Sequence, residues 1–473
     1  MLFNTAQFAA FFALFYIAFY FVAKRPSEKL WLVAIASLYF YASWNWKFVF
    51  LLVGTGAVDY YIAQAIDSSA DPRRRKRLLT MSVVMNLGVL ALFKYSNFVL
   101  ANIGSFLATF HAQRKMPIVD IVLPVGISFY TFQSISYTVD VYRGVFKPRQ
   151  RLMEFLASLT FFPHLVAGPI VRSSMLLPQF SAFHSGTLAA TRIALLNIAA
   201  GLTKKTLADL VAPQVETVFG STGPLSMGEA WAGALGFTAQ IYGDFSGYTD
   251  IAIGVSLMLG FTLPKNFDLP YLATSPTEFW RRWHISLSSW LRDYLYIPLG
   301  GNRLGAMRTR INLMLTMLLG GLWHGASWTF VLWGLYHGCL LAGTQALTPR
   351  GPQPTGGATW WSRLSLGIKL LLTFYLTVIG WVLFRGKNVA SVMAVLRGMH
   401  AGVQAPSLFW PGASPRLAFA VGVIVLCHAV DYLKSRKEAQ MLRPVTWCIA
   451  VLIGVAVPFL LGGSGNQFIY FQF

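Results

Sequence analysis

Charged side chains are scarce in this sequence, and their scarcity restricts the class of protein. Asp, Glu, Lys and Arg make up 12% of the 473 residues, whereas hydrophobic residues make up 55%. A soluble globular domain carries about 25% charged residues. The composition therefore argues against a soluble domain and predicts a protein that crosses a membrane several times.

Cysteines and the motifs of soluble enzymes are also scarce. Cys339, Cys427 and Cys448 lie in apolar segments without the spacing of metal ligands, so we interpret them as small buried side chains. The sequence has no Walker loop and no GxGxxG, HExxH, paired CxxC or GxSxG motif. We therefore expect neither a metal site nor a permanently bound cofactor.

Long apolar segments, in contrast, follow one another along the whole chain. A helix that crosses a bilayer needs about 20 apolar residues, and by this criterion we predict about 10 to 12 spans. The predicted spans are 7–23, 30–45, 47–66, 78–101, 118–140, 154–172, 190–212, 229–260, 309–346 (broken or doubled), 364–384, 415–433 and 444–462. No soluble segment separates them, so we expect one integral-membrane domain over residues 1–473.

Acidic residues are outnumbered by basic ones, 17 to 38, for a net charge of +21. A basic patch would suggest a nucleic-acid partner, but the basic residues cluster between apolar spans, at 24–29, 73–77, 143–151 and 434–437. This distribution follows the positive-inside rule, and it places the N-terminus and the C-terminal tail outside. We therefore expect a lipid bilayer and no nucleic acid. The first span begins almost at Met1 without a basic n-region, so we expect it to be retained.

Helix-breaking and ionisable residues concentrate between 123 and 338. Irregular backbone at membrane depth is tolerated only where protein buries it or where it lines a cavity. We therefore expect a polar pocket or tunnel here, with kinked packing helices as the alternative. Segments 123–130 and 161–170 are predicted to be broken helices, and His164 is a candidate substrate contact.

His324 is the leading candidate for a catalytic residue. It lies within GGLWHG (320–325), midway along the apolar segment 311–341, and an ionisable residue at such depth indicates a functional site by default. Burial disfavours the charged form of an imidazole, so His324 could take the proton from a hydroxyl that attacks an acyl carbon. The alternative is a histidine bonded across a helix interface, the role we assign to His337.

Small and aromatic residues surround His324 in the sequence. Glycines at 320, 321 and 325 would let a substrate approach the backbone. Tryptophans at 323, 328 and 333 would form the walls of the site and exclude water.

His284 is a second candidate, in the segment 280–303. Apolar residues recur there at helical spacing, and the arginines at 281 and 282 interrupt them too often for a lipid-facing span. We predict an interfacial or re-entrant helix that ends at 298–301. A basic helix on anionic lipid is an equal alternative, although it does not explain His284.

Two acidic residues, Asp244 and Asp250, fall within the span 229–260. Charged groups at this depth need partners. Asp244 shares a helical face with Tyr248 and could orient His284 or His324, or pair with an arginine at 281 or 282; for Asp250 we favour a structural ion pair. Lys204 and Lys205 could attract phosphates of a cytosolic cofactor, although simple topology is the stronger interpretation.

The chain resembles the membrane-bound O-acyltransferase family, in particular the alginate O-acetyltransferase-like branch of bacterial polysaccharide acetylation proteins. The most specific region is 123–345, and the resemblance is carried by 123–144, 161–170, 240–254, 280–303 and 321–338. It implies a ring of helices around a central funnel in the bacterial inner membrane. It also implies that His324 is the principal catalytic residue and His284 the second active-site residue.

The same resemblance implies the substrates. We expect transfer of acetyl from cytosolic acetyl-CoA toward hydroxyls of an exported, alginate-like polysaccharide, with a periplasmic esterase-like acetyltransferase as partner. The predicted donor contacts are Trp323, Asp244, Ser246, Tyr248, Arg281 and Arg282. The alternatives are the same chemistry on peptidoglycan, teichoic acid or lipid, and a transporter or flippase without chemistry of its own.

The last six residues, FIYFQF (468–473), resemble the terminal motif of small companion proteins in D-alanylation systems. That resemblance implies a tyrosine hydroxyl that carries the acyl group, and it makes Tyr470 a candidate relay on the periplasmic side. An aromatic anchor at the membrane interface is the alternative.

Overall fold

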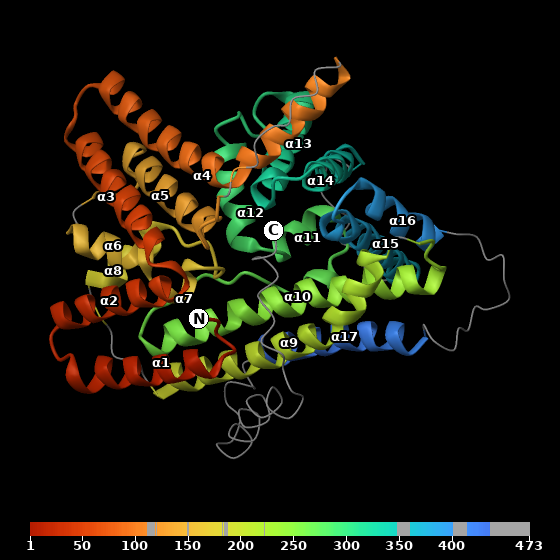
Figure 1. The fold of residues 1–473 in the computed structure, drawn as a ribbon, viewed down its shortest axis with the longest axis horizontal. Coiled ribbons are helices and arrows are strands. Elements are labelled where there is room, and N and C mark those ends of the chain that lie inside the picture. Colours follow the sequence, from red (N-terminus) through yellow and green to blue (C-terminus); the bar gives the residue numbers. More distant parts are fainter. Residues whose placement is uncertain are drawn as a thin grey trace. The chain divides into compact units, whose positions relative to one another are not determined.

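The computed structural model describes residues 1–110, 119, 121–148, 151–181, 183, 188–221, 223–347, 360–400 and 414–435. Every regular element in these residues is a helix (Figure 1). The contacts divide the chain into two compact units. Unit 1 comprises Met1–Ile198 and Ile251–Pro264, and unit 2 comprises Ala199–Asp250 and Lys265–Phe473. The prediction of an all-α membrane protein is confirmed.

Unit 1 consists mainly of consecutive helices, several of which begin at a proline or a polar cap. Thr5 caps the first helix by accepting a hydrogen bond from the Phe8 backbone, and Asp71 caps the fourth through the Arg73 backbone. The helices are α1 (Ala6–Ile17) with the π-turn η1 (Ala18–Val22), α2 (Pro26–Asn45), α3 (Lys47–Ser68), α4 (Pro72–Thr109), α5 (Ile127–Tyr142), α6 (Leu152–Thr160), α7 (Phe162–Leu165) and α8 (Ser173–Ser181). Helices α9 (Leu188–Gly220) and α10 (Met227–Met258) contribute to both units.

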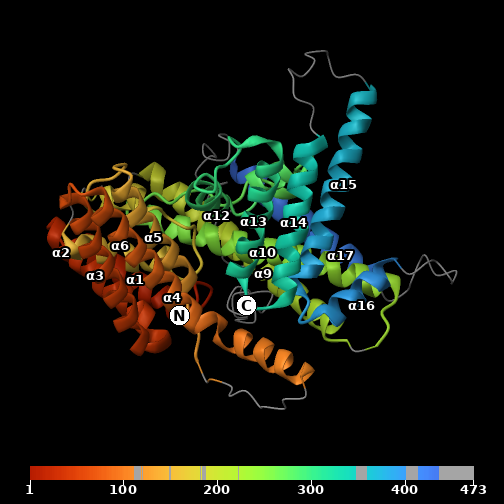
Figure 2. The ribbon, with the colours of Figure 1, turned by 90° about the horizontal axis from the view of Figure 1, so that it is seen from above.

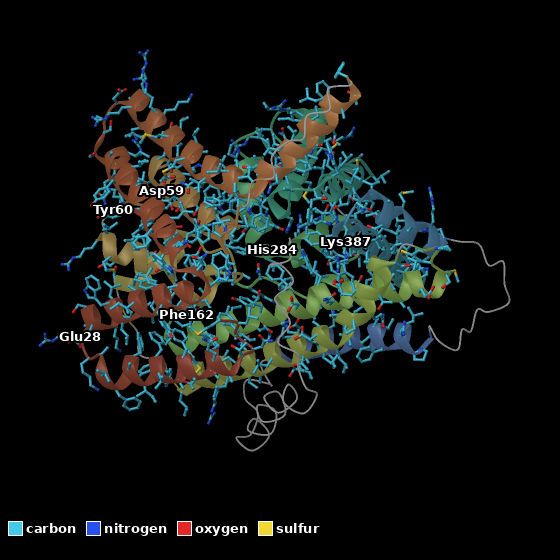
Figure 3. All side chains as sticks on the ribbon, in the orientation of Figure 1. Glu28, Asp59, Tyr60, Phe162, His284 and Lys387 are labelled. Carbon is cyan, nitrogen blue, oxygen red and sulfur yellow. The ribbon has the colours of Figure 1, made fainter. Side chains whose placement is uncertain are left out.

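A buried carboxylate joins three helices of unit 1. Asp59 of α3, labelled in Figure 3, accepts hydrogen bonds from Ser82 Oγ (2.6 Å) and Asn86 Nδ2 (2.8 Å) of α4. Ser82 Oγ also lies 3.1 Å from Thr138 Oγ1 of α5. Since a buried polar group is tolerated only when it is hydrogen-bonded, this cluster fixes the register of α3, α4 and α5.

Unit 2 contains the histidine-rich segments. Its further elements are η2 (Pro270–Leu272), α11 (Pro276–Arg282), α12 (Ile285–Leu291), the π-turn η3 (Arg292–Tyr296), α13 (Gly305–His324), α14 (Trp328–Leu347), α15 (Trp360–Arg385), α16 (Val389–His400) and α17 (Ser414–Ser435). Helices α13 and α14 lie side by side, and α15 packs against α14 (Figure 2).

The structure refines the predicted spans. Four described helices are long and apolar enough to cross a membrane: Lys47–Ser68, Pro72–Thr109, Ser365–Arg385 and Pro415–Lys434. The segment 309–346 is doubled, as one alternative had it, because the chain leaves the helix between α13 and α14. A continuous span over 154–172 is wrong, since Phe161 interrupts it between α6 and α7. The predicted span 444–462 lies outside the described residues.

Glycines permit the close packing of α13 on α14. A Cβ at Gly321 would meet the carbonyl oxygen of Phe330 at less than van der Waals distance and the backbone of Gly334 at 3.1 Å. We therefore expect Gly321→Ala to destabilise the protein by about 1–3 kcal/mol, as overpacking does. Thermal unfolding of the detergent-solubilised chain measures the effect.

Gly343 of α14 provides the control. No described atom lies within 4 Å of a Cβ at this position, so Gly343→Ala is expected to gain up to about 1 kcal/mol of helix propensity. Equal melting temperatures for Gly321→Ala and Gly343→Ala would contradict the close contact of the two helices.

Candidate active site

His324 is the last residue of α13, at the break between α13 and α14 and not in mid-helix. Its side chain is buried, with 6% of the residue exposed. The centroid of the imidazole ring lies 4.9 Å from that of Trp323 and 5.1 Å from those of Trp333 and Phe384. Helices α13, α14 and α15 thus each contribute one aromatic side chain to the surroundings of His324. The chain leaves the helix directly after this histidine.

Two predictions about the surroundings of His324 are wrong. The glycines at 321 and 325 approach Phe330, through its backbone and its ring respectively, so they make room for protein and not for substrate. Trp328 is 56% exposed and cannot form a wall of the site. Trp323 and Trp333 contact His324 as predicted.

His284 lies at a sharp bend between α11 and α12, where Figure 3 labels it. The residue is 0% exposed and has φ +43°, a left-handed conformation that non-glycine residues adopt rarely. The prediction of one helix from 280 to the turn at 298–301 is therefore wrong. Strained backbone of this kind concentrates at functional sites.

Trp323 brings the two predicted catalytic histidines into one cluster. The centroid of its indole lies 4.9 Å from that of His324 and 6.3 Å from that of His284. The ring of Phe245 of α10 packs edge to face with that of His284, at a centroid distance of 4.7 Å. Two imidazoles from separate segments therefore share one buried, aromatic environment, in which the effective dielectric constant is low.

Polar residues near Phe245 in α10 are also buried. Asp244, Ser246 and Tyr248 are at most 5% exposed. Asp244 forms an ion pair with Lys205 Nζ (2.9 Å), and Lys205 also binds Asp209 (2.5 Å). A lysine of α9 is therefore a charged partner of Asp244.

A second ion-pair cluster, which we call the α17 cluster, includes Asp250, six residues after Asp244 in α10. Lys204 Nζ contacts Asp250 (2.7 Å) and Asp431 of α17 (2.8 Å), and Lys434 contacts Asp250 (2.5 Å). Tyr242 donates a hydrogen bond to Asp431. The structural interpretation of Asp250 is confirmed, because its charge is neutralised by two lysines.

The suggestion that the lysines of α9 attract the phosphates of a cofactor is wrong. Lys204 and Lys205 are 0% and 5% exposed and bound to carboxylates, so neither is available to cofactor phosphates. The ion pairs of Asp431 and Lys434 in the α17 cluster were not predicted from the sequence. Their signal is a spacing of three residues in an otherwise apolar helix, which places both on one face.

The remaining predicted residues of unit 2 lie around the bend at His284. Arg281 is exposed, and Arg282 forms an ion pair with Glu278 (2.7 Å). Trp280 Nε1 donates a hydrogen bond to His337 Nδ1 (3.3 Å), which confirms the interface role of His337.

His164 belongs to unit 1, in the short helix α7, and its Nε2 lies 3.1 Å from the carbonyl oxygen of Ser158. The broken-helix prediction for its segment is confirmed. Tyr470 lies outside the described residues, so its role as a relay stays a prediction. Among the described side chains no group of three His, Cys, Asp or Glu residues could hold a metal ion.

Comparison with known proteins agrees with this arrangement. Residues 77–384 match the membrane-bound O-acyltransferase family. The chain is 43% identical to a probable alginate O-acetylase of Pseudomonas aeruginosa, over 85% of this chain and 75% of the relative. It is 34% identical to a peptidoglycan O-acetyltransferase of Helicobacter pylori, over 100% of this chain and 98% of the relative.

A more distant relative is a teichoic acid D-alanyltransferase of Bacillus subtilis, 27% identical over 61% of this chain and 74% of the relative. All three names describe transfer of an acyl group, so the alternative of a transporter without chemistry is wrong. The chain belongs to the membrane-bound O-acyltransferase family and is an O-acyltransferase.

Proposed function

We propose that this protein moves acetyl groups from cytosolic acetyl-CoA across the bacterial inner membrane toward hydroxyls of an exported, alginate-like polysaccharide. The observation that carries the proposal is the cluster in which His284 and His324 both contact Trp323. The similarity to a probable alginate O-acetylase supports the acceptor class.

The chemistry follows from a neutral imidazole in a water-poor site. His324 takes the proton as an acceptor hydroxyl attacks the acetyl carbon of the thioester, and the tetrahedral intermediate collapses with cleavage of the carbon–sulfur bond. The proton passes to the departing thiolate, so the products are an acetyl ester and free CoA. His284 is the second proton-handling group. The aromatic walls exclude water that would otherwise hydrolyse the donor.

The donor contacts remain proposals. Arg281 is exposed and can meet the phosphates of acetyl-CoA. Ser246 and Tyr248 are buried on α10 and suit the acyl end of the donor. Asp244 is held by Lys205, which favours an orienting role over direct contact. Handover outside would involve a periplasmic esterase-like acetyltransferase, with Tyr470 as the candidate relay.

Peptidoglycan is the second candidate acceptor. The relative from Helicobacter pylori named for that activity aligns with the whole of this chain and 98% of its own length. The same histidine chemistry would serve either acceptor, so the two candidates are distinguished by which polymer becomes acetylated.

The test uses membrane vesicles from cells with and without the full chain, supplied with acetyl-CoA labelled in the acetyl group. We expect chain-dependent, alkali-labile label on added alginate. Label on peptidoglycan alone would establish the second candidate. Absence of chain-dependent consumption of acetyl-CoA would overturn the proposed donor.

A further inference from the structure

One buried side chain, Asn266, holds the bend at His284. The backbone carbonyl oxygen of Asn266 accepts a hydrogen bond from the backbone N–H of Ile285 (2.9 Å). Its side-chain Oδ1 accepts two hydrogen bonds from Ser286, one from the backbone N–H (3.2 Å) and one from the hydroxyl (2.7 Å). Asn266 is 0% exposed, so water does not compete for these bonds. These hydrogen bonds fix the position of the first residues of α12 and stabilise the left-handed conformation of His284.

These bonds also fix which way the amide of Asn266 faces. A backbone N–H can only donate, so the atom that meets the N–H of Ser286 must be the amide oxygen and not the nitrogen. The amide nitrogen then points to the other side, where Thr249 Oγ1 lies 3.5 Å away. The orientation of the amide follows from its neighbours.

The amide orientation in turn decides the tautomer of His284. His284 Nδ1 lies 3.3 Å from Asn266 Oδ1. An amide oxygen only accepts, so Nδ1 must carry the hydrogen of this bond. In a neutral imidazole the other nitrogen, Nε2, then holds the lone pair.

We propose that Asn266 is a positioning residue that keeps His284 in the Nδ1–H tautomer and so leaves Nε2 to accept a hydrogen bond or proton from the reacting groups. This inference rests on the proposed role of His284 in acyl transfer. It assigns a function to the polar segment between α10 and α11, to which the sequence motifs gave no chemistry.

Nitrogen NMR on the full chain in lipid nanodiscs tests the tautomer directly. With ¹⁵N-labelled histidine, the signals of His284 are identified by their loss in His284→Gln. We expect a protonated Nδ1 and an unprotonated Nε2 in the native protein. Ser286→Ala removes one hydroxyl donor but leaves Oδ1 and Nδ1 in place, so it should keep this pattern. A protonated Nε2 in the native protein would overturn the inference.

Activity measurements on Asn266 variants provide a second readout. Asn266→Leu keeps the backbone carbonyl but removes the acceptor, so we expect a mixture of tautomers and a kcat lowered by about 10- to 100-fold at little change in KM. Asn266→Asp restores an oxygen acceptor and should recover the Nδ1–H tautomer with much of the kcat. A native kcat in Asn266→Leu would contradict the positioning role.

The outcomes separate this inference from the proposed function. Full activity of His284→Gln would refute the catalytic role of His284, whatever its tautomer. Inactive His284→Gln combined with an Nε2–H tautomer in the native protein would refute the role of Asn266 alone. If Asn266→Leu does not fold, the spectra of native protein, Asn266→Asp and Ser286→Ala still decide the question.

Discussion

Replacing His324 by glutamine is expected to lower the rate of acetyl transfer by about 10²–10⁴-fold, the contribution of a positioned general base. Glutamine retains hydrogen-bonding capacity and similar bulk within the walls formed by Trp323, Trp333 and Phe384. It cannot take the proton of the attacking hydroxyl. The measurement is the rate at which alkali-labile acetyl appears on the acceptor, per amount of folded protein.

His337 is the matched control. It is a buried histidine of the same helix pair, its ring centroid 4.9 Å from that of Trp333, and its Nδ1 accepts a bond from Trp280. Glutamine at 337 can still accept that bond, so His337→Gln should keep most of the activity. Equal losses in the two variants would show that the aromatic cluster, and not the base at 324, is what the substitution disturbs.

Replacing Lys204 by methionine is expected to destabilise the protein by about 3–5 kcal/mol, the cost of stranding buried charges. Lys204 is 0% exposed and neutralises both Asp250 and Asp431. Methionine conserves most of the apolar stem but leaves two carboxylates with Lys434 as their remaining charged partner among the described residues. Thermal or denaturant unfolding in detergent measures the loss.

An exposed ion pair of equal length tests whether burial causes this loss. Lys265 Nζ lies 2.7 Å from Asp268 Oδ1, but the two side chains are 59% and 51% exposed. Surface pairs contribute about 0–1 kcal/mol, so Lys265→Met should change stability little. A comparable loss in both variants would refute the importance of burial in the α17 cluster.

Features that depend on one segment were predictable from the sequence. The all-α class follows from composition, and the doubling of 309–346 follows from its length and central glycines. Asp250 was assigned to an ion pair because a charge at that depth needs a partner. His337 was assigned to a helix interface because that is the common role of a lone buried histidine.

Features that depend on distant segments were not predictable. The apolar spacing of 283, 287 and 290 continues past the bend, so periodicity alone gave one helix. The bend is held by Asn266, 18 residues before His284. The partners of Asp250 lie on two other helices, and no pattern within α10 specifies them. The packing of the glycines at 321 and 325 against Phe330 was not predictable either, because the sequence does not specify which residues pack against them.

The most direct test of the central claim is the formation of free CoA by the purified protein in liposomes, with acetyl-CoA on one side and acceptor on the other. The native chain should release CoA in step with acetylation of the acceptor, whereas folded His324→Gln should release almost none. Acceptor acetylation by His324→Gln at the native rate would contradict the assignment of His324 as the base.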